Sequence, residues 1–260
     1  MVGVALRRVK ITLEYDGTDF YGWQVQAATG ERTVQGVIEQ VLAAIPGAVP
    51  RVHAAGRTDA GVHALAMVAH YDTGDSIPDR QVARALNARL PEDVRVVDAR
   101  RVGRDFQAQF HCRYRRYLYR IRLARDYPAG AALDRCRVWF VYQRLDVAAM
   151  QAAAKVFEGT NDFASMATQE TRPTVRTVYA CRLDQNGRDV TVNVVADGFL
   201  RGMVRAMIGT LLWVGEGRLA AEDVTRILRR GDRTLAGPNA PPHGLYFAEA
   251  GYEEWRPDRM

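Results

Sequence analysis

Apolar side chains recur along this chain with two different periods, and the period predicts which element each segment forms. Residues 9–14 alternate apolar and polar side chains, as expected of a strand with one buried face. Residues 34–45 instead place their apolar side chains on one helical face, and Thr33 immediately before them predicts an N-cap. The same criteria predict further helices at 79–90, 145–158, 198–215 and 221–230, and further strands at 52–55, 62–71, 94–102, 113–122, 174–183, 189–196 and 244–248.

The order of these elements favours an α+β fold. Predicted strands arrive in adjacent pairs separated by helices, which favours a mostly antiparallel sheet over a doubly wound parallel one. The polar segments 161–163 and 168–173 are predicted to be loops. The chain has 260 residues, and a boundary near Asp105 divides it into two halves of similar content, 1–105 and 106–260.

The loop between the predicted strands 52–55 and 62–71 combines a tight turn with two opposite charges. Gly56 and Gly61 allow the backbone to turn sharply and a ligand to approach closely, and Arg57 and Asp59 lie between them. A strand connection whose Asp merely caps the turn would look the same. A single Asp beside an Arg can also be a nucleophile, because the cation holds it ionised.

Several other kinds of site are not indicated. The loop lacks the ending of a phosphate loop, no glycine-rich dinucleotide motif opens a helix, and no Gly-x-Ser-x-Gly elbow occurs. The loop offers one carboxylate, where glycosidases usually need two. The three cysteines stand alone and the five histidines show no ligand spacing, so neither a disulfide framework nor a metal is expected.

The apolar runs are short, which bears on location. No run reaches about 18 residues, so we expect no membrane span, and the N-terminus lacks the apolar core of a signal peptide. We therefore expect a cytoplasmic protein with reduced cysteines.

Positive charge is concentrated in residues 100–125, which hold nine Arg and one Asp within a chain of net charge +6. Such a segment predicts a polyanion partner. Within it, the strand 113–122 interleaves Arg and Tyr, which suits base stacking beside phosphates but also suits an edge strand with a solvated face. One ionised carboxylate, a basic and aromatic strand and no metal together suggest covalent chemistry on a base in nucleic acid.

Residues 56–64, Gly-Arg-Thr-Asp-Ala-Gly-Val-His-Ala, resemble the signature of the bacterial tRNA pseudouridine synthase A family. Six further segments resemble the family in the same order, and the match spans nearly the whole chain. They are 15–18, 22–26, 33–36, 116–119, 197–205 and 244–246.

The resemblance implies a pseudouridine synthase fold, in which two α+β halves share a mostly antiparallel central sheet with the active site in a cleft. It implies a homodimer and no cofactor. The implied activity is isomerisation of uridine to pseudouridine at positions 38–40 of the tRNA anticodon stem-loop.

The resemblance also assigns roles by motif. Asp59 would be the nucleophile, and Arg205 would pair with it. Tyr117 would stack on the uracil and assist proton transfer, and Leu245 would pack against the base. Arg57 would help to hold the nucleotide out of its stack, since chemistry on a base requires extrusion.

One segment departs from the family pattern. Where the family commonly has Phe-His-Ala-Arg-Phe, residues 106–110 read Phe-Gln-Ala-Gln-Phe, and Gln can still hydrogen-bond sugar or phosphate. The residues expected to contact RNA are Phe106, Gln107, Ala108, Gln109, Phe110, Arg113, Arg115, Arg116 and Arg125.

Two other functions remain open at this point. The chain could bind tRNA without catalysis, which a turnover assay would show. It could instead be a nuclease or glycosidase that uses Asp59, in which case the mass of the product would change on hydrolysis.

Overall fold

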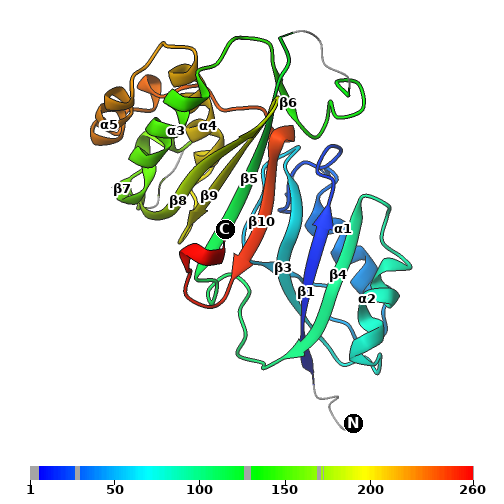
Figure 1. Cartoon of the computed structure of the whole chain (residues 1–260). Helices are drawn as coiled ribbons and strands as arrows, with labels where there is room; N and C mark the ends of the chain where they lie inside the picture. The colour runs from blue at the N-terminus through cyan, green and yellow to red at the C-terminus, as the bar shows by residue number, and fades with distance from the viewer. Residues whose placement is uncertain (1–5, 27–29, 126–129, 169–170, 172, 260) are drawn as a thin grey trace. The chain divides into compact units, whose positions relative to one another are not determined.

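The computed structural model confirms an α+β fold with mostly antiparallel strands (Figure 1). The chain forms two compact units. Unit 1 comprises Met1–Arg113 and Phe247–Glu254, and unit 2 comprises Tyr114–Tyr246 and Trp255–Met260. The residues that the structure describes are 6–26, 30–125, 130–168, 171 and 173–259. Of the predicted loop 168–173, residues 169, 170 and 172 lie outside this set.

Unit 1 is built on β1 (Arg7–Tyr15), which pairs antiparallel with β4 (Val94–Val102) on one side and β3 (His63–Thr73) on the other. The short strand β2 (His53–Ala54) also pairs with β3. In β1 the alternate side chains from Val9 to Tyr15 are buried, so the predicted period of two is confirmed.

Helices α1 (Val34–Ala43) and α2 (Asp79–Asn87) belong to the same unit. The predicted N-cap is confirmed, because the Thr33 side chain accepts a hydrogen bond of 3.2 Å from the backbone N–H of Gly36. The second helix ends three residues earlier than predicted. The side chain of Asn87 accepts a hydrogen bond from the backbone N–H of Val96 on β4 and donates one to its carbonyl, both at 2.8 Å. The helix ends at the residue that makes this tertiary contact.

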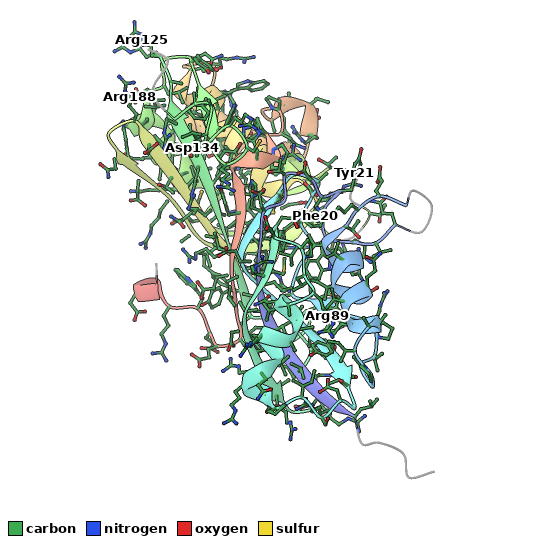
Figure 2. The ribbon with its side chains drawn as sticks, turned by 90° about the vertical axis from the view of Figure 1, so that its right-hand side faces the viewer. Phe20, Tyr21, Arg89, Arg125, Asp134 and Arg188 are labelled. Atoms are coloured by element: carbon green, nitrogen blue, oxygen red, sulfur yellow. The ribbon has the colours of Figure 1, made fainter. Side chains whose placement is uncertain are left out.

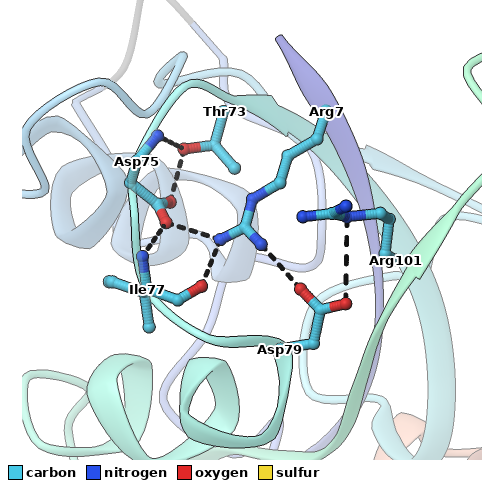
Figure 3. A network of polar contacts seen from close by, with 6 residues as sticks. All are labelled: Arg7, Thr73, Asp75, Ile77, Asp79 and Arg101. Carbon is cyan, nitrogen blue, oxygen red and sulfur yellow. Dashed lines mark hydrogen bonds and ion pairs between the residues drawn. The ribbon is translucent and has the colours of Figure 1, made fainter. Parts of the chain in front are cut away.

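A network of ion pairs and hydrogen bonds holds the start of β1 to the connection between β3 and α2 (Figure 3). The Arg7 guanidinium at the start of β1 forms ion pairs of 2.6 Å with Asp75 and with Asp79, the first residue of α2. It also donates to the carbonyl of Ile77. Burial opposes ionisation of Asp75, but hydrogen bonds from Thr73 and Ile77 and the Arg7 charge lower the pKa of its carboxyl overall. The connection from β3 to α2 is therefore anchored to the first strand.

Unit 2 contains four antiparallel strands in the order β5 (Tyr114–Leu123), β9 (Asp189–Ala196), β8 (Val175–Asn186) and β7 (Gly159–Asp162). A short strand, β6 (Trp139–Val141), runs parallel to β5. The loop predicted at 161–163 is partly wrong, since residues up to Asp162 form β7 by pairing with β8. That pairing is a contact between distant segments, which local composition does not reveal.

Three helices, α3 (Val147–Ala154), α4 (Met203–Gly215) and α5 (Ala221–Arg230), group beside β8 and β9 in unit 2 (Figure 1). The predicted bounds of α5 are confirmed. Helix α4 begins five residues later than predicted, because Gly202 adopts a left-handed conformation with φ of 72°.

The last strand, β10 (Leu245–Gly251), contains residues of both units. Among the described residues, no helix is long and apolar enough to cross a membrane. Short 3-10 turns occupy Lys155–Phe157, Ala164–Met166, Arg233–Leu235, Pro242–Gly244 and Pro257–Arg259.

Candidate active site

Asp59 lies in the loop that joins β2 to β3 in unit 1, as the sequence predicted. Thr58 is buried, Asp59 is half-buried and Arg57 is exposed, so the loop turns successive side chains in different directions. The backbone N–H of Val62 donates to the Asp59 carbonyl at 3.2 Å and closes the turn. The carboxylate is thus carried on a tight loop between two paired strands.

A second loop, which follows β1, holds the Asp59 loop on both sides. The backbone N–H of Trp23 donates to the Thr58 carbonyl at 3.0 Å, and the N–H of Gly61 donates to the Phe20 carbonyl at 3.2 Å. Phe20 is buried, and its neighbour Tyr21 is exposed (Figure 2). Residues on either side of Asp59 are therefore bonded to the same supporting loop.

Two glycines allow these loops to touch backbone to backbone. Gly22 has a φ of 82°, and a Cβ there would lie 2.5 Å from the Thr58 carbonyl oxygen. A Cβ on Gly17 would lie 2.0 Å from the Val62 carbonyl oxygen. Only glycine fits at either position, because the facing atoms belong to the main chain.

His63, the first residue of β3, connects the same two loops. Its Nδ1 atom lies 3.0 Å from the backbone nitrogen of Gly17 and 3.1 Å from an oxygen of Asp16. The imidazole is buried. The motifs at 15–18, 22–26 and 56–64, which are far apart in sequence, thus form one structural unit. The sequence identified these segments but not the supporting roles of Thr58 and His63.

Three of the predicted substrate-binding residues belong to unit 2. Tyr117 is in the middle of β5 and is only 7% exposed, with its ring 5.0 Å from that of Phe199 at an interplanar angle of 86°. Arg205 lies in the first turn of α4, and its Nε atom donates to the Ala240 carbonyl at 2.7 Å. Leu245 begins β10 and is buried.

The predicted RNA-contacting segment 106–110 lies in unit 1, between β4 and β5. Ala108 is fully buried at its centre, where its N–H donates to Nδ1 of His70 at 3.2 Å and its carbonyl accepts from the Tyr252 hydroxyl at 2.9 Å. Phe110, in contrast, is 79% exposed. Two side chains from distant segments therefore clamp the backbone that presents an exposed aromatic ring.

The His70 and Tyr252 side chains that bond to Ala108 are part of an aromatic cluster that also contains a buried cation. The Lys10 ammonium lies 5.5 Å from the Phe106 ring centroid and 4.5 Å from that of Tyr252. Burial, with the nearby charges of Arg8 and His53, lowers the pKa of His70 to about 4. His70 is therefore neutral at physiological pH, as a nitrogen that accepts a hydrogen bond requires.

The arginines of the basic segment differ in their surroundings. Arg115 donates to the Asp197 carbonyl at 2.8 Å, and Arg116 is 3.4 Å from the side-chain oxygen of Asn193. Arg113 is exposed. Hydrogen bonding to Asp189 and Asp134 raises the pKa of Arg122, which forms ion pairs of 2.6 Å with both carboxylates.

Exposed charge also collects where β5 ends. Arg125 is exposed there, and the Leu123 N–H donates to the carbonyl of Arg188 in the turn between β8 and β9 (Figure 2). The basic segment thus contains both internally bonded and exposed arginines.

The chain is similar to proteins of known family over most of its length. A family model described as tRNA pseudouridine synthase matches residues 11–115 and 153–253. A tRNA pseudouridine synthase A of Thermus thermophilus is 47% identical over 253 residues, which cover 96% of this chain and 98% of the relative. A tRNA pseudouridine synthase A of Solidesulfovibrio magneticus is 46% identical over 248 residues, which cover 92% and 89%.

Among solved structures, a Cbf5–Nop10–Gar1 complex contains a chain that matches with 15% identity and a TM-score of 0.37. The match covers 92% of this chain and 49% of that one.

Proposed function

The chain belongs to the tRNA pseudouridine synthase family, and on this premise we propose that it converts uridine to pseudouridine at positions 38–40 of the tRNA anticodon stem-loop, with Asp59 as nucleophile. A tRNA pseudouridine synthase is an isomerase. The reaction breaks the bond from ribose C1′ to uracil N1 and forms one from C1′ to C5, and a proton leaves C5 while N1 gains one. The product therefore has the mass of the substrate.

The observation that supports this role for Asp59 is the pair of backbone hydrogen bonds that hold its loop on both sides. The backbones of Thr58 and Gly61 are hydrogen-bonded to the loop after β1, while Asp59 itself is half-buried. A carboxylate fixed in this way can form a covalent ester with the nucleoside at little cost in ordering. The exposed Arg57 beside it is proposed to hold the uridine out of its stack.

Residues of unit 2 are proposed to receive the extruded base. Tyr117 supplies a ring for stacking and a hydroxyl for proton transfer, and Leu245 supplies an apolar contact. Arg205 is proposed to be energetically coupled to Asp59, because a guanidinium keeps a carboxylate ionised. A double-mutant cycle with Asp59→Glu and Arg205→Lys measures that coupling as the part of the change in turnover that the two single variants do not explain.

The remaining proposals concern the partner and the assembly. The segment 106–110, apart from its fully buried Ala108, and four arginines, Arg113, Arg115, Arg116 and Arg125, are proposed to contact the tRNA backbone. We propose that residues 1–105 provide the nucleophile and that 106–260 provide most groups for the base.

A homodimer in the cytoplasm is proposed as well, and light scattering of the purified protein tests the dimer.

The central experiment incubates purified protein with unmodified tRNA and maps pseudouridine by position. Product at 38–40 supports the proposal, and product elsewhere or a change in RNA mass contradicts it. Asp59→Asn should abolish product and leave tRNA affinity nearly unchanged, because Asn keeps the shape but forms no ester. Asp19→Asn, an exposed Asp in the supporting loop, is the matched control. Normal binding without turnover by the unaltered protein would favour a non-catalytic tRNA-binding protein.

A further inference from the structure

Arg205 is held to one loop of unit 2 by both its backbone and its side chain. The N–H of Ala240 donates to the Arg205 carbonyl at 2.9 Å, and Nε of Arg205 donates back to the Ala240 carbonyl at 2.7 Å. The direction of the guanidinium is thereby tied to the position of residue 240. Whatever fixes the loop 237–241 also fixes Arg205.

The loop is pressed against the helix that carries Arg205. Its Gly237 N–H donates to the Thr210 hydroxyl at 3.0 Å, and that hydroxyl donates to the Ala206 carbonyl at 2.8 Å. A Cβ on Gly209 would lie 1.7 Å from the carbonyl oxygen of Pro238. Backbone therefore meets backbone, one turn along α4 from Arg205.

The same loop wraps around a second guanidinium, that of Arg233. One of its terminal nitrogens donates to the Gly237 carbonyl at 2.8 Å, and the other donates to the side-chain oxygen of Asn239 at 3.0 Å. The side-chain nitrogen of Asn239 in turn donates to the Thr168 hydroxyl at 3.3 Å. Asn239 thus connects Arg233 to a third segment of the chain.

Thr168 is itself attached to the N-terminal end of α4. Its N–H donates to the Arg201 carbonyl at 2.9 Å. Gly202 has a φ of 72°, and a Cβ there would lie 2.8 Å from the Thr168 hydroxyl and 3.2 Å from the side-chain nitrogen of Asn239. The amide of Asn239 therefore lies where three segments of the chain meet, and a Cβ at residue 202 would crowd both its side chain and that of Thr168.

We propose that Asn239 is a positioning residue: held by Arg233 and bonded to Thr168, it fixes the loop 237–241 and through Ala240 orients the Arg205 guanidinium. This inference rests on the proposed function for the role of Arg205 in turnover. It extends that function by naming a residue that acts through Arg205. A misplaced group near the chemistry can lower a rate up to about 100-fold without abolishing binding.

The first test is independent of activity. In the full-length protein, the solvent exchange of the Arg205 Nε–H is measured by NMR, with its signal assigned from an Arg205→Lys sample. Asn239→Leu removes both side-chain bonds and should raise the exchange rate about tenfold or more. Asn239→Asp should stay near wild type, because it still accepts from Arg233 and from the Thr168 hydroxyl. Unchanged exchange in folded Asn239→Leu would overturn the proposal.

The second test is kinetic and uses a matched control. Asn239→Leu should lower kcat for tRNA about tenfold and change KM less than about twofold, with rescue by Asn239→Asp. Asn186→Leu, an exposed Asn beside the turn between β8 and β9, should have no effect. If Asn239→Leu fails to fold, Thr168→Val should raise Nε–H exchange and Thr168→Ser should restore it, and equal exchange in these two variants would contradict the proposal.

The outcomes for the two proposals are separable. Wild-type protein that makes no pseudouridine would refute the proposed function, whereas the exchange measurement would still decide whether Asn239 positions Arg205.

Discussion

The phenolic oxygen of Tyr15 lies 2.8 Å from the hydroxyl of Thr58, in the interior of unit 1 and one residue before Asp59. Both side chains are buried, so neither hydroxyl can exchange this partner for water without cost. The last residue of β1 is thereby linked to the loop of the proposed nucleophile.

Tyr15→Phe should therefore lower turnover while tRNA affinity stays nearly constant. The variant leaves the buried hydroxyl of Thr58 without this partner, which lowers the free energy of unfolding by about 1–3 kcal/mol. Because the same bond holds the loop of Asp59, we expect turnover to fall about tenfold. Single-turnover rates and binding isotherms measure the two effects. Tyr21→Phe is the matched control, since Tyr21 is 57% exposed in the adjoining loop. Equal rates for wild type and Tyr15→Phe would show that this bond does not support catalysis.

Gly22→Ala should destabilise the protein more than Gly30→Ala. Both glycines have positive φ, 82° and 63°, and a left-handed conformation costs a side chain about 1–2 kcal/mol. At Gly22 the new Cβ would also meet the Thr58 carbonyl oxygen at 2.5 Å, whereas nothing lies within 4 Å at Gly30. The difference in free energy of unfolding between the two variants isolates the close approach. Equal losses would mean that the Asp59 loop moves aside freely.

Tyr117→Phe should keep much of the tRNA affinity, and Tyr117→Ala should lose both binding and turnover. Stacking of a base on an aromatic ring is worth roughly 1–3 kcal/mol. Because the Tyr117 ring packs edge-on against Phe199, the Ala variant should also melt at a lower temperature. Affinity must therefore be measured well below that temperature. Identical binding and turnover by both variants would exclude stacking on the substrate.

tRNA affinity should fall steeply with salt, and replacing Arg113, Arg115 and Arg116 together by Gln should flatten that dependence. Each neutralised phosphate contributes about −0.7 to −0.9 to the slope of log K against log salt. Arg115 and Arg116 already donate within the protein, so the change should be smaller than three full contacts. The control replaces three exposed arginines of α5 by Gln: Arg226, Arg229 and Arg230. The same slope in both triple variants would mean that the basic strand is only a solvated face.

Stability should fall as the pH decreases from about 6.5 towards 4. The pKa of His70 is lowered to about 4 in the folded protein, so the unfolded chain binds this proton more readily than the folded one. Neutral His70 contributes fully to the free energy of unfolding above pH 6.5. Below that pH its contribution falls by about 1.4 kcal/mol per pH unit, and the total loss is about 3 kcal/mol at most.

Urea unfolding as a function of pH measures this contribution. His70→Asn keeps an acceptor for the Ala108 N–H but does not titrate, so it should flatten the profile between pH 4 and 6.5. His111→Asn, at an exposed histidine, is the control. An unchanged profile in His70→Asn would assign the acid sensitivity to other groups.

Elements with strong local signals were predictable from the sequence. Thr33 caps α1, and α5 and β4 have their predicted bounds, because capping side chains and regular apolar spacing act within a few residues. Two features that depend on distant contacts were not predicted correctly. β7 exists through pairing with β8, and the start of α4 depends on the conformation of Gly202.

The sequence by itself determined the family and, with it, the segments that carry the proposed chemistry, because residue types at fixed spacing are a local property. It also determined where charge is concentrated. Only the tertiary structure decided what supports those segments: Tyr15 and Gly22 meet the Asp59 loop across some 40 residues, and Asn239 meets Thr168 across 71. Such contacts depend on how the chain closes its loops and packs its strands, and no spacing along the chain encodes them directly.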